Sequence, residues 1–308
     1  GFVSEPFAFA LHERYRVPLL IGALQPYLPT GAGWASLVAP FPRRVSVFNR
    51  LGAEAGYRLI WNVAADSVNR LRGRIGLAPL RGGAYVSAAK RLPHLFAFSP
   101  SVVPQPPDWE AKDRVIGYWF LDETDRYQPD ADLVAFIEGG PPPVYIGYGS
   151  STASDPQAKV DQAAAALEQA GQRGIFLAGW SGADPSRAYP HMKVIHGAAH
   201  DWLFPRMAAL VHHGGAGTTA AGLRAGKPTL IIPHIADQPY WGRRVHELGV
   251  GPAPIPRQRA TVAALAAAIR AMTSDRVLIE RAQQLGAAIR AEDGLAATVR
   301  VVAAQFER

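Results

Sequence analysis

The chain has 308 residues, of which 48% are hydrophobic and 19% charged. This gives room for about two domains with buried cores and excludes a disordered chain or a disulfide-stapled miniprotein. It contains no cysteine, which excludes disulfides, thiol catalysis and cysteine-bound zinc and fits a cytoplasmic protein. The net charge of +7 comes from scattered basic residues. We therefore expect anionic small-molecule ligands rather than nucleic acid, and peripheral membrane contact stays open.

The first part of the chain predicts an α/β domain that is incomplete at its start. An apolar run at 18–25 predicts a strand, and apolar residues spaced among arginines predict a helix from about 43 to 75. Two further short strands are expected, at 95–98 and 115–119. The residues before 18 lack the apolar strand and glycine-rich turn that open a nucleotide-binding domain.

Prolines separate this domain from a more regular second one. Because prolines cannot donate ladder hydrogen bonds, Pro129 and Pro141–Pro143 predict a linker over 121–142, between a first domain at 1–120 and a second at 143–308. The second domain alternates apolar strands with helices, which predicts a parallel, doubly wound sheet with ligands beyond the carboxyl ends of its strands. Its expected strands are 144–148, 174–179, 192–196, 209–212 and 229–233, and its expected helices are 156–170, 217–225, 238–248, 261–273, 276–291 and 295–306.

The densest motif is His212-His213-Gly214-Gly215-Ala216-Gly217-Thr218, between an apolar strand and a helix. Glycines at such a turn let the backbone approach a ligand, and the free amides at the start of the helix form an anion site. His213 and the Thr218 hydroxyl can donate further hydrogen bonds to a phosphate. The alternative is that the glycines serve close packing and both histidines are buried and satisfied.

The same glycines also allow a dinucleotide interpretation. Gly215 to Ala220 matches G-x-G-x-x-A, and Asp237 follows Gly215 by 237 − 215 = 22 residues, near the spacing of a ribose-binding carboxylate. Against it, the motif follows roughly the fourth strand of its domain rather than the first. Asp237 with Gln238 either binds sugar hydroxyls or caps the following helix.

These motifs together resemble the UDP-glycosyltransferase superfamily, and are especially similar to its sterol 3-β-glucosyltransferase branch and bacterial relatives. The resemblance covers most of the chain. The segments that carry it are Phe98–Pro104, Gly117–Phe120, Ile146–Ser150, Asp201–Pro205, His213–Thr219, Gly226–Thr229, Asp237–Gly242 and Gly249–Pro252.

The resemblance implies a GT-B fold, with two facing Rossmann-like domains built on parallel sheets. The N-terminal domain would bind the acceptor and the C-terminal domain the nucleotide sugar. By position, Asp237 and Gln238 would bind the hexose, and His213 would meet the diphosphate. Other diphosphate contacts would come from Gly149, Ser150, Ser151, Gly215, Ala216, Gly217 and Thr218.

The chain departs from plant members where they hold the nucleoside. A Trp-x-Pro-Gln element is replaced by Gly197-Ala198-Ala199-His200, and a ribose-binding Glu by Ala221. Ala199 and His200 are therefore nucleoside-binding candidates, together with Trp180, which would stack on the base or simply fill the core. The base would be uracil or thymine.

The resemblance places the general base, a histidine, in the first loop of the N-terminal domain, upstream of where Gly1 aligns. Roughly a hundred residues of a typical member are expected to precede Gly1. His12 and His94 fall at other positions and are interpreted as structural, so no catalytic residue is assigned. Aromatic candidates for acceptor contact, or for ordinary core packing, are Tyr27, Trp34, Phe48 and Trp61.

The sequence thus predicts an inverting hexosyltransferase that uses a UDP- or dTDP-sugar and a lipophilic acceptor such as a sterol, polyketide or flavonoid. No metal and no cofactor are expected, because the helix end and His213 would stabilise the leaving diphosphate. Two alternatives stay open. One is a nucleotide-sugar-binding module without catalysis, and the other is an NAD-dependent oxidoreductase. The sequence does not predict an oligomeric state.

Overall fold

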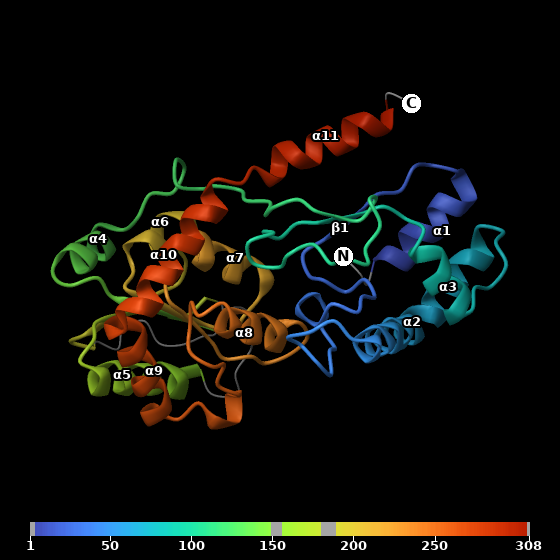
Figure 1. Ribbon diagram of the computed structural model, residues 1–308. Coiled ribbons are helices and arrows are strands. Elements are labelled where there is room, and N and C mark those ends of the chain that lie inside the picture. Colours follow the sequence, from blue (N-terminus) through green and yellow to red (C-terminus); the bar gives the residue numbers. More distant parts are fainter. Residues whose placement is uncertain (1–3, 149–155, 180–188, 307–308) are drawn as a thin grey trace. The chain divides into compact units, whose positions relative to one another are not determined.

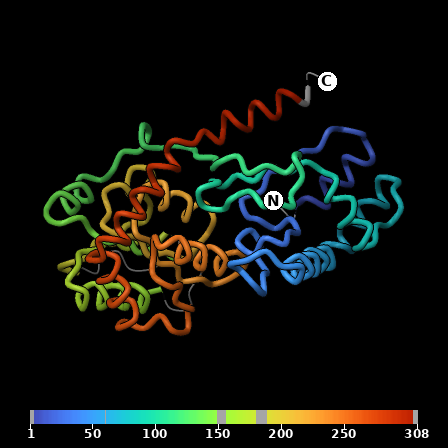
Figure 2. Tube along the Cα trace, viewed as in Figure 1, coloured from blue at the N-terminus to red at the C-terminus, as the bar shows by residue number. Residues whose placement is uncertain are grey.

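The structure is a computed structural model that describes residues 4–148, 156–179 and 189–306 (Figure 1). The chain divides into two compact units. The first combines Gly1–Trp119 with Glu292–Arg308, and the second is Phe120–Ala291. The chain thus leaves the first unit after Trp119 and returns to it at Glu292. Figure 2 shows the chain trace coloured from the N-terminus to the C-terminus. No described helix combines the length and apolarity needed to cross a membrane.

The first unit is built on a three-stranded parallel sheet in the order β1-β2-β3. Ile21 lies opposite His94 in the first strand pair, and Leu95 lies opposite Arg114 in the second. The three strands come from the predicted regions but are shorter. The elements are α1 (Glu5–Tyr15), β1 (Ile21–Ala23), η1 (Gly33–Ala35), α2 (Val47–Arg74), α3 (Gly82–Ala89), β2 (His94–Phe96), β3 (Arg114–Val115) and α11 (Gly294–Phe306).

Helices α1, α2 and α3 of the first unit either were not predicted or begin at a different residue. Helix α2 starts at Val47 rather than near 43, because Ser46 is extended and its hydroxyl accepts the Phe48 amide hydrogen at 3.2 Å, as an N-cap does. Helices α1 and α3 were not predicted. Helix α3 opens on Gly82-Gly83, a pair with poor helix propensity.

The structure places the last helix in the first unit, whereas the predicted second domain ran to residue 308. Backbone at Gly117 and Gly294 is so close that a Cβ on Gly294 would lie 2.6 Å from the Gly117 carbonyl carbon. The Trp119 indole donates to Thr298 Oγ1 at 2.6 Å, and Ser99 Oγ donates to Glu292 Oε1 at 2.6 Å. These contacts fix the beginning of α11 to the end of the first unit's sheet.

The predicted linker over 121–142 is part of the second unit. It contains helix α4 (Ala131–Glu138), whose Leu133 is buried against Tyr145 and Ile175 of the sheet. Its earlier residues are held by Asp201, whose carboxylate accepts the backbone amides of Glu123 and Thr124 at 2.8 and 2.7 Å. The proline-rich segment therefore packs against the second unit and is part of it.

The second unit is a five-stranded parallel sheet in the order β6-β5-β4-β7-β8, as the alternating pattern predicted. Val144 and Ile146 pack against α5 and α9 on one face, and Tyr145 packs toward α4 and α6 on the other, because side chains alternate along a strand. The remaining elements are β4 (Val144–Gly147), α5 (Pro156–Ala170), β5 (Gly174–Leu177), β6 (Met192–Ile195), α6 (His200–Leu203), η2 (Phe204–Arg206), β7 (Ala209–His212), α7 (Ala216–Arg224), β8 (Thr229–Ile231), α8 (Gln238–Glu247), η3 (Arg257–Arg259), α9 (Val262–Ser274) and α10 (Arg276–Arg290).

Candidate nucleotide-sugar site

The candidate site lies in the second unit, where the carboxyl ends of β7 and β8 meet the first turns of α7 and α8. The glycine motif follows β7, which is the fourth strand of the second unit's sheet in chain order. A dinucleotide fingerprint belongs after the first strand. The position of the motif after the fourth strand therefore argues against the NAD interpretation, as the sequence already indicated.

The turn from β7 into α7 requires glycine at its first position. Gly214 has φ = 91°, and a Cβ on it would lie 2.5 Å from Ile231 Cγ2. Gly215 is the N-cap of α7 and supplies no side-chain hydrogen bond, so the amides of the first helical turn face outward uncapped. At Gly217 a Cβ would meet no atom within 4 Å. This opening is where a phosphate can approach the backbone.

His213 covers the start of α7. Its Nε2 would lie 2.7 Å from a Cβ on Gly215, and its Nδ1 is buried without a hydrogen-bond partner in the described part of the chain. Burial lowers the pKa of His213, and the carboxylate of Asp237 opposes that lowering. A neutral imidazole with an unpaired ring nitrogen can donate a hydrogen bond to a phosphate oxygen.

The preceding His212 shapes the turn and is fully buried. Its Nδ1 accepts the Gly214 amide hydrogen at 3.0 Å, so the ring proton of the neutral form sits on Nε2. Burial lowers the pKa of His212 to about 3, and the neighbouring His213 contributes in the same direction. Of the two histidines, His212 thus fits the structural interpretation and His213 the ligand-facing one.

Asp237 and Gln238 occupy the start of α8, as predicted. Asp237 is the N-cap residue, yet its side chain makes no capping hydrogen bond; instead Oδ2 accepts the Trp241 indole hydrogen at 2.8 Å. Gln238 Oε1 accepts the amides of His234 and Ile235 at 2.7 and 3.0 Å. The amide oxygen of Gln238 is therefore occupied, so its NH2 group is the part free to face a ligand, beside the carboxylate of Asp237.

The nucleoside candidates Ala199 and His200 sit at the start of α6. Ala199 is buried in the core, so only its backbone is available to a ligand. The His200 ring stacks on Phe204 with centroids 4.3 Å apart. Burial lowers the pKa of His200, Asp201 opposes this, and His213 adds to it, which places the two histidines within electrostatic range.

Sequence reasoning missed Lys159, a cation near this edge of the sheet. Lys159, on the first turn of α5, holds its Nζ 5.1 Å above the Tyr148 ring, buried and without a hydrogen-bond partner among the described residues. Burial lowers the pKa of Lys159, and the charge of Arg257 lowers it further. His234 stacks on the same tyrosine, and burial with these two cations lowers its pKa to about 4. A lysine at a helix N-terminus opposes the helix dipole, and this is the signal that could have identified it.

The remaining predicted residues are placed as follows. Gly149, Ser150, Ser151 and Trp180 lie outside the described residues. In the first unit, His94 is fully buried with Nδ1 3.0 Å from Asp113 Oδ1, and the His12 ring contacts the Val17 carbonyl, both within the fold. Tyr27 and Trp61 are core residues, Trp34 is partly buried, and Phe48 is exposed.

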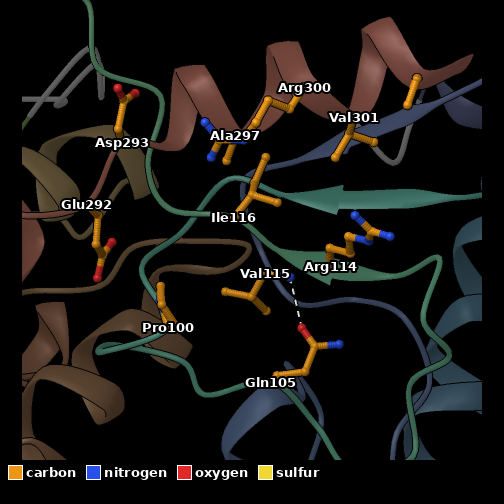
Figure 3. Close-up of a pocket in the computed structure, with 11 residues that line it drawn as sticks. Pro100, Gln105, Arg114, Val115, Ile116, Glu292, Asp293, Ala297, Arg300 and Val301 are labelled. Carbon is orange, nitrogen blue, oxygen red and sulfur yellow. Dashed lines mark hydrogen bonds between the residues drawn. The ribbon is translucent and has the colours of Figure 1, made fainter. Parts of the chain in front are cut away.

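The first unit also contains a cavity of about 760 Å³ between β3, the loop before it and α11 (Figure 3). The side chain of Gln105 forms one wall of the cavity. Its Oε1 accepts the Val115 amide hydrogen at 2.9 Å and its Nε2 donates to the Asp113 carbonyl at 2.7 Å, which are the hydrogen bonds that a neighbouring strand would make. Arg114 and Arg300 line the cavity from β3 and α11. None of the residues predicted for the nucleotide-sugar site lines it.

Comparison with known proteins supports the resemblance. Residues 192–302 match the family described as erythromycin biosynthesis protein CIII-like, C-terminal domain. A sterol 3-beta-glucosyltransferase of Arabidopsis thaliana is 38% identical over 97% of this chain and 47% of its own length. The O-mycaminosyltylonolide 6-deoxyallosyltransferase of Streptomyces fradiae is 39% identical over 81% of this chain and 58% of its own.

The fold has a counterpart among solved structures. The calicheamicin glycosyltransferase superposes with a TM-score of 0.68 at 17% identity, over 97% of this chain and 70% of that one. The predicted α/β class and GT-B fold are thereby confirmed, as is the relationship to sterol 3-beta-glucosyltransferases. The chain spans about half the length of the Arabidopsis thaliana and Streptomyces fradiae relatives.

Proposed function

We propose that the chain carries the donor-binding unit and part of the acceptor-binding unit of an inverting glycosyltransferase. It would move a hexose from a UDP- or dTDP-sugar to a hydroxyl of a lipophilic acceptor. The observation that carries this proposal is the convergence of the uncapped α7 amides, His213 and Asp237 at one edge of the second sheet. The names of the relatives, one for a sterol and one for a tylonolide derivative, support the acceptor class.

The reaction we propose is a single in-line displacement at the anomeric carbon. The acceptor hydroxyl gives its proton to a general base, and its oxygen forms the new bond to the anomeric carbon as the bond to the diphosphate breaks, so negative charge develops on the departing phosphate. The α7 amides, the His213 ring and the cation of Lys159 are arranged to stabilise that charge. We assign no catalytic base to the described residues, and metal independence and a cytoplasmic location stay predictions.

Sugar recognition would be divided between two side chains with opposite roles. Asp237 offers carboxylate oxygens that accept from hexose hydroxyls, and the indole of Trp241 fixes its orientation. Gln238 offers an NH2 donor because its oxygen is bound to backbone amides. A pair with one acceptor and one donor can hold two adjacent hydroxyls of a sugar ring.

Calorimetry with UDP and UDP-glucose tests these roles separately. His213→Ala should weaken both ligands by roughly 10- to 100-fold, the range expected for a hydrogen bond to a charged group. Asp237→Ala should weaken UDP-glucose by a similar factor and leave UDP unchanged. His246→Ala, which removes an exposed histidine from the same helix as Asp237, is the control. Equal losses of UDP affinity in both variants would show that Asp237 is structural.

The alternative functions give different results. Binding of NAD without a response to UDP or dTDP would favour the oxidoreductase and contradict the glycosyltransferase. Incubation of the full-length protein with UDP-glucose and a panel of hydrophobic alcohols separates an enzyme from a binding module. If UDP-glucose binds but neither a glycoside nor hydrolysed donor forms, the protein is a nucleotide-sugar-binding module.

A further inference from the structure

Helix α2 is apolar on both of its sides. Tyr57, Trp61 and Val68 face the core of the first unit and are buried. Phe48, Leu51, Leu59 and Val63 recur at helical spacing on the opposite side, where they are 55% to 84% exposed. A surface helix of a folded domain normally carries polar residues on that side, so the exposed apolar residues need an explanation.

The preceding loop extends this apolar face. Phe41 and Val45 are 40% and 58% exposed, and the Phe41 ring packs edge-on against Phe48 with centroids 6.2 Å apart. We name the outward side chains of Phe41, Val45, Phe48, Leu51, Leu59 and Val63 the apolar stripe. It lies wholly within the first unit, and α2 is labelled in Figure 1.

The loop is held in place by a buried polar side chain. Asn49 is fully buried, and its amide donates to the carbonyls of Gly31, Phe41 and Arg44 at 2.9 to 3.0 Å. Its Oδ1 accepts the Phe41 amide hydrogen at 2.9 Å. Buried hydrogen-bond networks of this kind rigidify the backbone that they join. The loop is thus fixed in a conformation that presents Phe41 and Val45 outward.

Basic residues outnumber acidic ones around the first half of the stripe, where Glu54 pairs with Arg50 at 3.7 Å and Asp108 Oδ2 accepts the Gly31 amide hydrogen at 2.8 Å. Residues 14–53 contain no aspartate or glutamate, whereas Arg43, Arg44 and Arg50 lie in the loop and the first turn of α2 and are exposed. The Arg44 guanidinium lies 5.4 Å from the centre of the Phe41 ring. Apolar side chains flanked by arginines are the composition of helices that lie in the interface of an anionic bilayer.

We propose that the apolar stripe and its arginines dock on an anionic lipid surface. Phe41, Val45, Phe48 and Leu51 would enter the boundary between headgroups and acyl chains, and the arginines would bind lipid phosphates. The proposal does not depend on the proposed function, because no residue of the nucleotide-sugar site belongs to the stripe.

Cosedimentation with vesicles tests the proposal. One set contains phosphatidylcholine and phosphatidylglycerol in equal parts, and the other phosphatidylcholine alone. The protein should bind the anionic set more tightly, and binding should fall as salt is raised. Phe48→Ser with Leu51→Ser should reduce partition at least about tenfold, because two exposed apolar side chains are lost. Arg43→Glu with Arg44→Glu should reduce it by at least about 30-fold.

The control is the pair Val277→Ser with Arg276→Glu, which makes the same types of change at exposed positions of α10. The thermal midpoint, measured in parallel, reports whether each variant is folded, and UDP affinity separates this test from that of the proposed function. Absence of wild-type binding to anionic vesicles, or an equal loss in the α10 control, would overturn the proposal. So would a wild-type dimer that Phe48→Ser with Leu51→Ser splits into monomers without changing vesicle partition, because the stripe would then be a protein interface.

Discussion

Two glycines three residues apart in the same turn should respond to alanine in opposite ways. Gly214 has φ = 91°, and its Cβ would lie 2.5 Å from Ile231 Cγ2. The left-handed backbone costs alanine about 1–2 kcal/mol, and forcing an extra methyl into a packed site costs about 1–3 kcal/mol. Gly214→Ala should therefore lower the free energy of unfolding by about 2–5 kcal/mol. Gly217 has ordinary helical backbone and open space around its Cβ.

Gly217→Ala should leave stability unchanged or raise it by up to about 1 kcal/mol, since alanine is the better helix former. Its methyl group would occupy the space through which a phosphate reaches the α7 amides, so UDP affinity should fall at least about tenfold. Urea denaturation gives the free energies of unfolding, and calorimetry gives the UDP affinities. A Gly214→Ala variant as stable as the wild type would refute the steric argument. Unchanged UDP affinity in Gly217→Ala would refute the placement of the phosphate.

Two further predictions concern the buried titratable groups. The pKa of His212 is about 3 in the folded chain, so this side chain is neutral there. Between about pH 6.5 and 3 the unfolded chain therefore binds more protons than the folded one. The free energy of unfolding should fall as the pH falls, by roughly 1.4 kcal/mol per pH unit. The asparagine of His212→Asn can still accept the Gly214 amide hydrogen, but it does not titrate. Urea denaturation from pH 6 to 4 should therefore show the wild type losing stability faster than this variant. Equal losses in the two proteins would contradict the prediction. Lys159→Gln should weaken UDP roughly tenfold and leave the thermal midpoint unchanged or higher, because a buried cation without a hydrogen bond is removed. Lys193→Gln, on β6, is the matched control, and a lower midpoint with unchanged UDP affinity would make Lys159 structural.

The sequence predicted the second unit well because its signals are local. A run such as Val144 to Tyr148 is buried on both faces of the sheet, and this leaves a continuous apolar run that is recognisable without a partner. The first unit was predicted less completely. Helix α3 begins with two glycines, and packing of the rest of the helix, not propensity, holds it against Trp61 and Tyr57.

The division into two compact units was harder to predict, because it depends on contacts between residues distant in sequence. Nothing near residue 294 shows that its glycine will meet Gly117, or that Thr298 will bind the Trp119 indole. In the candidate site, the glycine turn and Asp237 were predictable from a short motif. Lys159 was missed because it reaches the site from a different helix and matches no motif, and its place at a helix N-terminus was the one sign of it.

Buried polar atoms without partners support the placement of the site more strongly than the motif alone. In the described part of the chain eight buried side-chain polar atoms lack a hydrogen bond, and Lys159, His212, His213 and Thr219 supply four of them. Because folded proteins satisfy most such atoms, the unpaired Lys159 Nζ and His213 Nδ1 are consistent with a ligand site at this edge of the sheet. His94 has an unpaired ring nitrogen too, but it is fully buried in the core of the first unit. At the sheet edge the unpaired Lys159 and His213 accompany an uncapped helix end, and a ligand rich in acceptor oxygens, such as a diphosphate, would satisfy both.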